Sequence, residues 1–353
     1  MPDKQKKIGI GIVAVMLCAL AFYFLHWVKT PVYSIKLIRD SIAQHDTVAF
    51  EKHVDLDTIY NKGFDDFIVA QSKISGDDIL DNPLAAGMVQ MMKPSIVSKF
   101  KTETLELMKG TDAAKNTANP QTGTQSNVPA DGASQTLNQK GKMNYMSYKD
   151  ASVISKESDT AIVAIALHDR LVDKDFTLKV KMSKLDDGSW KLKELTNLAE
   201  FLIEYDKAEK EKLAEIDKPI KEQVYKALQI VGFTGQKHTT GGYFPSYSLN
   251  ISYSLKNSSD KNITRATAYC DFIDQQENII KTYPLNDFLN IAKDATVSST
   301  TIINLNEFDG PDKKLIDTDP SEIMPRIKVM SIEFVDGSKI ERPTKLPAPA
   351  EKK

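Results

Sequence analysis

The stretches TAIVAIALH (residues 160–168) and FTLKVKMSKL (176–185) have the clearest period of two in the chain. Successive side chains of a β-strand point to opposite faces, so this period predicts two strands. Similar alternation over 148–155 and 189–195 predicts two more, and polar turn residues separate the four segments. We therefore predict an antiparallel sheet of about four strands after a set of helices, which is an α+β unit.

Helical periodicity precedes this sheet. Thr30-Pro31 predicts a helix start, because threonine caps a helix and proline is tolerated in its first turn. Asp46 predicts the cap of another helix, and further helix is expected over 64–68 and 79–108. In the last of these we expect the large apolar residues to fill the core: Met88, Met91, Met92, Ile96, Val97 and Phe100.

An uncharged apolar run covers residues 8–28, directly after a lysine-rich start. As a helix it would be roughly 31 Å long, which matches a hydrocarbon core of about 30 Å. A cleaved signal peptide has a shorter apolar region and small residues at its cleavage site, whereas this run ends in Phe24-Leu25-His26-Trp27. We therefore predict an uncleaved transmembrane helix over 8–28 that contacts the lipid bilayer.

The predicted topology follows from this helix. Residues 1–7 would form a cytoplasmic head, and the long remainder would cross, since long domains are translocated largely regardless of charge. We expect a single-pass protein of a bacterial cytoplasmic (inner) membrane whose later domains are extracytoplasmic, in the periplasm.

The composition is that of globular domains, with 41% hydrophobic and 27% charged residues. A net charge of −2 argues against a nucleic-acid partner, which would require a basic surface. Of the two cysteines, Cys18 falls in the apolar run and Cys270 in a strand-like segment, so we expect no internal disulfide. Residues 110–141 are rich in small and polar types and predict a disordered insertion in an α+β domain over 29–199.

The second half changes character at a charged helical stretch. Residues 200–229 predict a connector helix, with a kink or restart at Pro219 and Asp217 available as a cap. Residues 230–341 predict an all-β sandwich, and residues 342–353 a flexible tail. The expected strands of the sandwich are Tyr247–Leu255, Ile263–Ile273, Ile279–Tyr283, Thr296–Asn304 and Ile327–Val335.

Three resemblances refine this picture. Pro31-Val32-Tyr33-Ser34-Ile35 and Val54-Asp55-Leu56-Asp57 look like the opening of bacterial single-pass membrane proteins of unknown function. The later sheet, with its turn Asp187-Gly188-Ser189-Trp190 and its exit Asn197-Leu198-Ala199-Glu200, is similar to the cone-shaped α+β fold of the nuclear transport factor two-like superfamily, and the match covers about residues 31–205. The segment from Leu255 to Ile280 resembles extracytoplasmic immunoglobulin-like modules, which mostly serve as spacers or contact surfaces. The expected fold class is thus α+β, with an N-terminal transmembrane helix, a cone-shaped α+β domain, a charged connector helix and a C-terminal all-β sandwich.

Catalytic and metal patterns give no site. Asp55-Leu56-Asp57 resembles the aspartate pair of haloacid-dehalogenase-type phosphotransferases, but its helical context favours helix capping. His168 lies beside Asp169-Arg170, which favours a surface ion pair over a general base. We predict no catalytic, cofactor-binding or metal-binding residues, and no zinc site, since no pair has metal-ligand spacing among His26, His45, His53, His168 and His238.

The cone-shaped fold implied by the resemblance can enclose an apolar pocket between sheet and helix. Ile162, Ile165 or Leu167, and Trp190 could line such a pocket, although a filled core is the default expectation. The expected function is that of a non-catalytic, membrane-anchored binding protein of the cell envelope with a protein or envelope partner. The alternative is a small-ligand-binding or enzymatic cone domain.

Overall fold

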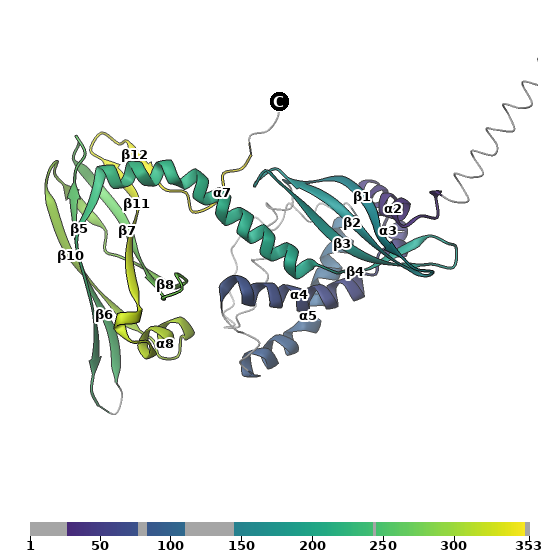
Figure 1. Cartoon of the computed structure of the whole chain (residues 1–353), viewed down its shortest axis with the longest axis horizontal. Helices are drawn as coiled ribbons and strands as arrows, with labels where there is room; N and C mark the ends of the chain where they lie inside the picture. Colours follow the sequence, from purple (N-terminus) through teal and green to yellow (C-terminus); the bar gives the residue numbers. More distant parts are fainter. Residues whose placement is uncertain (1–26, 77–82, 110–144, 243–244, 350–353) are drawn as a thin grey trace, which may run out of the picture. The chain divides into compact units, whose positions relative to one another are not determined.

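The computed structural model describes residues 27–76, 83–109, 145–242 and 245–349 (Figure 1). The chain divides into two compact units. Unit 1 comprises Met1–Lys210 and Pro347–Lys353, and unit 2 comprises Glu211–Leu346.

Unit 1 is built from helices followed by an antiparallel sheet of strand order β1-β2-β3-β4. The predicted four strands are therefore confirmed, and in Figure 1 they form one continuous twisted layer. The helices are α2 (Pro31–Ala43), α3 (Thr47–His53), α4 (Leu56–Ser75) and α5 (Pro83–Met108), and the strands are β1 (Met146–Lys156), β2 (Thr160–Asp169), β3 (Lys174–Lys184) and β4 (Trp190–Leu195).

The helix starts follow from their caps. The Thr30 hydroxyl accepts a hydrogen bond from Tyr33 N (3.1 Å), and Pro31 occupies the first turn of α2 as predicted. Asp46 accepts from Ala49 N (2.9 Å) and caps α3. Each cap satisfies a backbone N–H that has no partner inside the helix, which fixes where the helix begins.

Trp190 holds the helices onto the sheet. Its side chain is fully buried, and its indole N–H donates to Lys29 O (2.9 Å) just before α2. Its backbone N–H donates to the Ser34 hydroxyl (3.0 Å) in α2, and its carbonyl lies 3.0 Å from His53 Nδ1 at the end of α3. The expectation that Trp190 packs on the helices is confirmed.

Helix α5 contacts α4 mainly through its second half. The Tyr60 hydroxyl hydrogen-bonds the Thr104 hydroxyl, and the ring of Tyr60 stacks on Phe100 (centroids 6.1 Å apart). Val97 is buried, whereas Met88 and Met91 are 44% and 76% exposed. The prediction that these two methionines lie in the core is wrong, because the first half of α5 contributes little to the packed face.

The predicted fold class needs a correction at its amino end. In the part of the chain that the structure describes, no helix is long and apolar enough to cross a membrane. The predicted span over 8–28 lies outside that part except for Trp27 and Val28, which precede α2. The predicted disordered insertion over 110–141 also lies outside the described residues.

Unit 2 contains two antiparallel sheets whose inner faces share one apolar core. The first sheet has the order β10-β6-β5, and the second has the order β12-β11-β7-β8, with β9 also paired to β7. The strands are β5 (Leu228–Thr240), β6 (Ser246–Asn257), β7 (Ile263–Ile273), β8 (Ile279–Pro284), β9 (Phe288–Ile291), β10 (Thr296–Leu305), β11 (Met324–Phe334) and β12 (Lys339–Glu341).

The two-sheet core confirms the predicted pairing of sheets, but this unit is not all-β. Helix α8 (Gly310–Asp317) and the short 3-10 helix η4 (Pro320–Glu322) lie between β10 and β11. Asp309 caps α8. The Lys237 ammonium of β5 donates to carbonyls at the carboxyl end of α8, including Leu315 O (3.3 Å). Local capping and this cation stabilise a helix that the strand-like pattern did not indicate.

Helix α7 (Leu198–Ala227) continues through Pro219, so of the predicted kink or restart the restart does not occur. Asp217 does not cap a helix; its carboxylate instead accepts from Arg342 Nε (2.8 Å). Arg342 and Leu346 are 7% and 8% exposed, so the predicted flexible tail from residue 342 is wrong at its start. The α7 residue Tyr225 donates to Ile327 O (3.3 Å), and Arg342 donates to Val329 O (3.3 Å), so α7 and the tail together cover carbonyls of β11.

Candidate functional site

One row of side chains crosses all four strands of the unit 1 sheet. Ser155 of β1 is opposite Ile162 of β2, Ile162 is opposite Lys181 of β3, and Lys181 is opposite Glu194 of β4. The neighbouring row contains the buried residues Ala161 and Met182, which belong to the helix-facing core. Because strand side chains alternate, the row through Ile162 faces the opposite side of the sheet.

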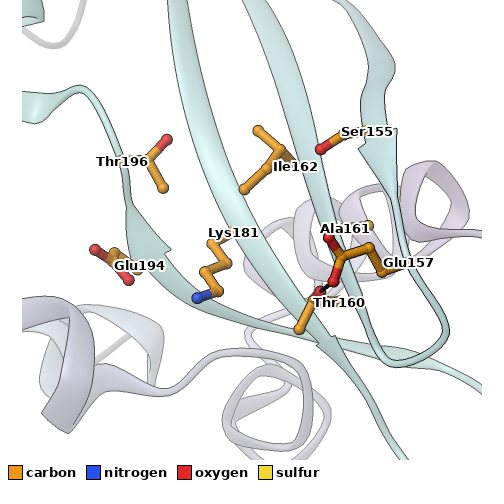
Figure 2. A pocket seen from close by; sticks show the side chains of 8 residues that line it. All are labelled: Ser155, Glu157, Thr160, Ala161, Ile162, Lys181, Glu194 and Thr196. Atoms are coloured by element: carbon orange, nitrogen blue, oxygen red, sulfur yellow. Dashed lines mark hydrogen bonds between the residues drawn. The ribbon is translucent and has the colours of Figure 1, made fainter.

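This row forms the floor of an open hollow of 370 Å³ (Figure 2). Figure 2 shows Ile162 and Lys181 on adjacent strands, with Thr196 and Glu194 on one side and the β1–β2 hairpin on the other. The hollow is lined by Ser155, Glu157, Thr160, Ala161, Ile162, Lys181, Glu194 and Thr196.

The hairpin end of the hollow is held by local hydrogen bonds. Glu157 N donates to Thr160 O (2.8 Å), and the Thr160 hydroxyl donates to Glu157 Oε2 (3.5 Å). At the other end, Thr196 N donates to Lys179 O (2.8 Å), which continues the ladder beyond β4. The polar rim is therefore fixed by strand pairing and by the turn.

The charges in the hollow are unevenly paired. Glu194 forms a salt bridge with Lys62 of α4 (2.6 Å), and Glu157 is near the Thr160 hydroxyl. Lys181 is half-buried and forms no ion pair with any residue in the described ranges 27–76, 83–109, 145–242 and 245–349. The hollow thus offers one cation, two carboxylates and three hydroxyl groups around a single large apolar side chain.

An acidic group lies next to this rim on α4. Burial and the nearby carboxylates of Glu200 and Glu194 raise the pKa of Asp66 above its ordinary value. Lys62 acts in the opposite direction but does not compensate. The ionised form of Asp66 is therefore less favourable in the folded chain than in the unfolded chain.

We expect Asp66→Asn to raise the melting temperature at neutral pH by about 1–2 °C. A raised folded pKa means that the folded state binds the proton more tightly, so stability increases as the pH falls through that value. The gain from the amide should therefore disappear below about pH 4, where the Asp66 carboxyl group is protonated in both the folded and the unfolded chain. Thermal unfolding from pH 3 to pH 8 measures this, with the exposed Asp150→Asn as a control; an equal gain at every pH would contradict the explanation.

The structure divides the residues predicted to line a cone pocket between two faces. Ile162 lies in the hollow on the helix-free face, whereas Ile165 packs against the helix-facing core. Trp190 is fully buried in that core together with Val163 and Met182. The space between sheet and helices is filled at these positions, and the hollow lies on the other face, which the sequence analysis did not consider.

His168 contacts carboxylates at the surface, but not the carboxylate of its neighbour Asp169. Its Nδ1 lies 2.7 Å from Asp175 Oδ1, and its Nε2 lies 3.8 Å from Asp173 Oδ1. Asp169 is instead fully buried and accepts from Leu171 N (2.7 Å) and from the Tyr205 hydroxyl (3.3 Å).

Ser147, His168 and Asp175 lie in one cross-strand row, which combines the residue types of a hydrolase triad. The Ser147 hydroxyl, however, donates to the backbone carbonyl of His168 (3.2 Å), and the second ring nitrogen of His168 is directed toward Asp173. A triad requires the ring nitrogen to accept from the nucleophile, so these three residues do not form a triad.

Asp55 and Asp57 have structural partners. Asp55 accepts from Thr58 N (3.2 Å) as the cap of α4 and also binds Lys193 (2.6 Å). Burial opposes its ionisation, but the hydrogen bonds from Lys193 and Thr58 outweigh burial and lower the pKa of Asp55. Asp57 pairs with Lys101 of α5 (2.7 Å). The prediction that this segment caps a helix is confirmed.

Cys270 is fully buried in β7, and burial raises the pKa of its thiol to about 12. A thiol with this pKa is a poor nucleophile at neutral pH. Within the described segments, no three His, Cys, Asp or Glu side chains gather in a way that could hold a metal ion. Of the features above, the hollow is the one that offers polar groups to a binding partner.

Comparison with known proteins adds no further assignment, because neither a protein-family model nor a curated protein matches the chain.

Proposed function

We propose that this chain is a non-catalytic binding protein of the bacterial cell envelope, and that unit 1 binds a protein or envelope component on the helix-free face of its sheet. The observation that carries the proposal is the open hollow of 370 Å³ with Lys181 on its floor. The location in the envelope is inferred from the sequence alone.

The character of the hollow supports binding over catalysis. Catalysis by nucleophile and base requires both groups within hydrogen-bond reach of each other. In the hollow the carboxylates of Glu157 and Glu194 are instead engaged by a neighbouring hydroxyl and by Lys62. Polar groups arranged around one apolar side chain are typical of the rim of an interface.

The two-unit organisation also fits this role. Helices followed by an antiparallel sheet support the proposed relation of unit 1 to the nuclear transport factor two-like superfamily. Two facing sheets support the proposed relation of unit 2 to immunoglobulin-like modules, which mostly serve as spacers or contact surfaces. Fold alone does not specify the partner.

Site-specific crosslinking tests the proposal. A photo-reactive amino acid in place of Ile162, in the full chain in its native cells, should give one discrete adduct with a partner. Lys181→Glu reverses the charge on the floor of the hollow and should reduce the yield of this adduct at least about tenfold.

Lys179→Glu provides the matched control, because Lys179 is exposed on the same strand and face but does not line the hollow. It should leave the adduct unchanged. The proposal is contradicted if no adduct forms, or if the two charge reversals affect its yield equally.

A small-ligand site is the second candidate, because 370 Å³ lies within the range of about 300–1,000 Å³ that is usual for small-molecule pockets. A ligand that binds only the folded chain raises its melting temperature. A small molecule that raises the melting temperature by several degrees in the parent chain, but not in Lys181→Glu, would favour this candidate over a macromolecular partner.

A further inference from the structure

Strand β10 (Thr296–Leu305, TVSSTTIINL) is an edge strand of the β10-β6-β5 sheet in unit 2. Figure 1 shows it as the outermost strand of that sheet. It contains no charged residue, no proline and no glycine, and most of its residues are β-branched. An edge strand of this composition is a template for pairing with another strand.

Five other edge strands in the described residues have features that oppose such pairing. Strand β5 has a bulge between Ile230 and Gly232, and its inward lysine, Lys237, binds α8. The β4 edge pairs with Val54, which leads into α4, and β12 has only 3 residues. Strand β1 has two register shifts, and β8 contains Lys281 and Pro284. These are the usual protections of natural edge strands, whereas β10 has no register shift and is covered only in part, by a contact with Asn286 of the β8–β9 loop.

The outward face of β10 carries hydroxyl groups and an apolar side chain, and no charge. The hydroxyl groups of Thr300 and Ser298 hydrogen-bond those of Ser252 (2.9 Å) and Ser254 (2.7 Å) on β6. Ile302 lies on the same face and is 62% exposed, and Phe308 in the following turn is 90% exposed. These apolar side chains would lose contact with water if a strand paired with β10.

We propose that β10 pairs antiparallel with β10 of a second copy of this chain, about a two-fold axis near Thr300. In such a pair Thr300 lies opposite its own counterpart, and Ser298 lies opposite Ile302 of the second copy. Outward residues therefore meet outward residues, which preserves the alternation on both strands. Because β10 is uncharged, no like charges face one another across the axis, and the pairing is self-complementary.

One side chain partly occupies this edge. Asn286 Nδ2 donates to Thr300 O (3.3 Å), and the backbone N–H of Asn286 donates to Thr301 Oγ1 (3.3 Å). Only the side-chain contact uses a backbone group of the edge. Pairing at Thr300 would replace it with a strand-to-strand hydrogen bond, so Asn286 opposes association.

Cysteine crosslinking of the full chain tests the register. In a Cys18→Ser background, Thr300→Cys should give a dimer with a short bis-maleimide crosslinker, because facing Cβ atoms of paired strands lie about 4.5–5.5 Å apart, slightly beyond the spacing of a disulfide. Thr234→Cys is the matched control, since Thr234 is exposed on the same face of the sheet but on the opposite edge strand. No dimer from Thr300→Cys, or an equal yield from both variants, would overturn the proposal.

Association in the absence of crosslinking provides a second test. Analytical ultracentrifugation of the full chain in a mild non-ionic detergent should show a concentration-dependent dimer. Ile302→Lys should raise its dissociation constant at least about tenfold by placing like charges near the axis. Asn286→Ala should lower the dissociation constant, and Thr234→Lys should leave it unchanged. A monomer at all concentrations, or a dimer insensitive to Ile302→Lys, would overturn the proposal.

Discussion

Trp190→Ala is expected to lower the free energy of unfolding of unit 1 by about 3–5 kcal/mol, the range for removing a large aromatic side chain from a core. Trp190 is fully buried among Met182, Val163 and Leu192. Alanine would leave a cavity there and would leave Lys29 O without its indole donor. Urea unfolding followed by far-UV circular dichroism measures the change without depending on the tryptophan signal.

Two other substitutions separate the contributions. Trp190→Phe keeps much of the volume but removes the indole N–H, so it should cost about half as much as alanine. Trp27 is 47% exposed, and Trp27→Ala should change stability by only about 0.5 kcal/mol. If the two alanine variants had equal effects, Trp190 would not be the residue that joins the sheet to the helices.

The strands of unit 1 could be predicted because each signal was local and repeated. The alternation in 160–168 matches its burial, since Ala161 and Val163 are 2% and 0% exposed, while Ile162 is half-buried. The helix starts at Thr30 and Asp46 were also predictable, because a cap depends on atoms within three residues.

The errors occurred where tertiary contacts outweigh local preference. Proline inside a helix costs about 3 kcal/mol, so a break at Pro219 was the local expectation. Helix α7 nevertheless continues through Pro219, with Tyr205 and Ala208 buried before the proline and Val224 and Ala227 buried after it. The error in the first half of α5 was to predict burial. Its residues are apolar, but residue type alone did not show that Met91 is exposed.

The candidate site could not be predicted for a related reason. Its central row depends on register, and register depends on the shifts between Val153 and Ser155 and between Lys181 and Met182. A slip of one residue moves every side chain to the other face of the sheet. The sequence indicated Ile162 as a pocket residue, but the shifts that place Lys181 and Glu194 beside it have no sequence signal that we can identify.

Arg342→Met is expected to destabilise unit 2 by about 3 kcal/mol at neutral pH, because it removes one partner of a buried ion pair. The Asp217 carboxylate would remain on α7 without its guanidinium, and Val329 O would lose a donor. A chain that ends at Glu341 should lose at least as much, since Arg342 N also donates to Met330 O (2.8 Å). Urea unfolding of the full chain measures both effects.

The dependence on pH identifies the cause of that loss. The hydrogen bond from Arg342 is the main reason that the pKa of Asp217 is lowered, with burial acting against it. A lowered folded pKa gives stability that is complete above the unfolded value of about 3.9 and is lost as the pH falls through the folded value. The difference in stability between the parent chain and Arg342→Met should therefore be constant from pH 6 to pH 8 and shrink below about pH 4.

A second substitution distinguishes the ion pair from packing of the tail. Arg342→Met combined with Asp217→Leu removes both charges and leaves apolar side chains of similar length, so it should recover at least about half of the loss. Packing alone predicts no recovery, because the aliphatic part of the side chain is already present in Arg342→Met. If the double variant were as unstable as the single one, packing of the tail against α7 would account for the loss. The charge on Asp217 would then contribute little to the stability of unit 2.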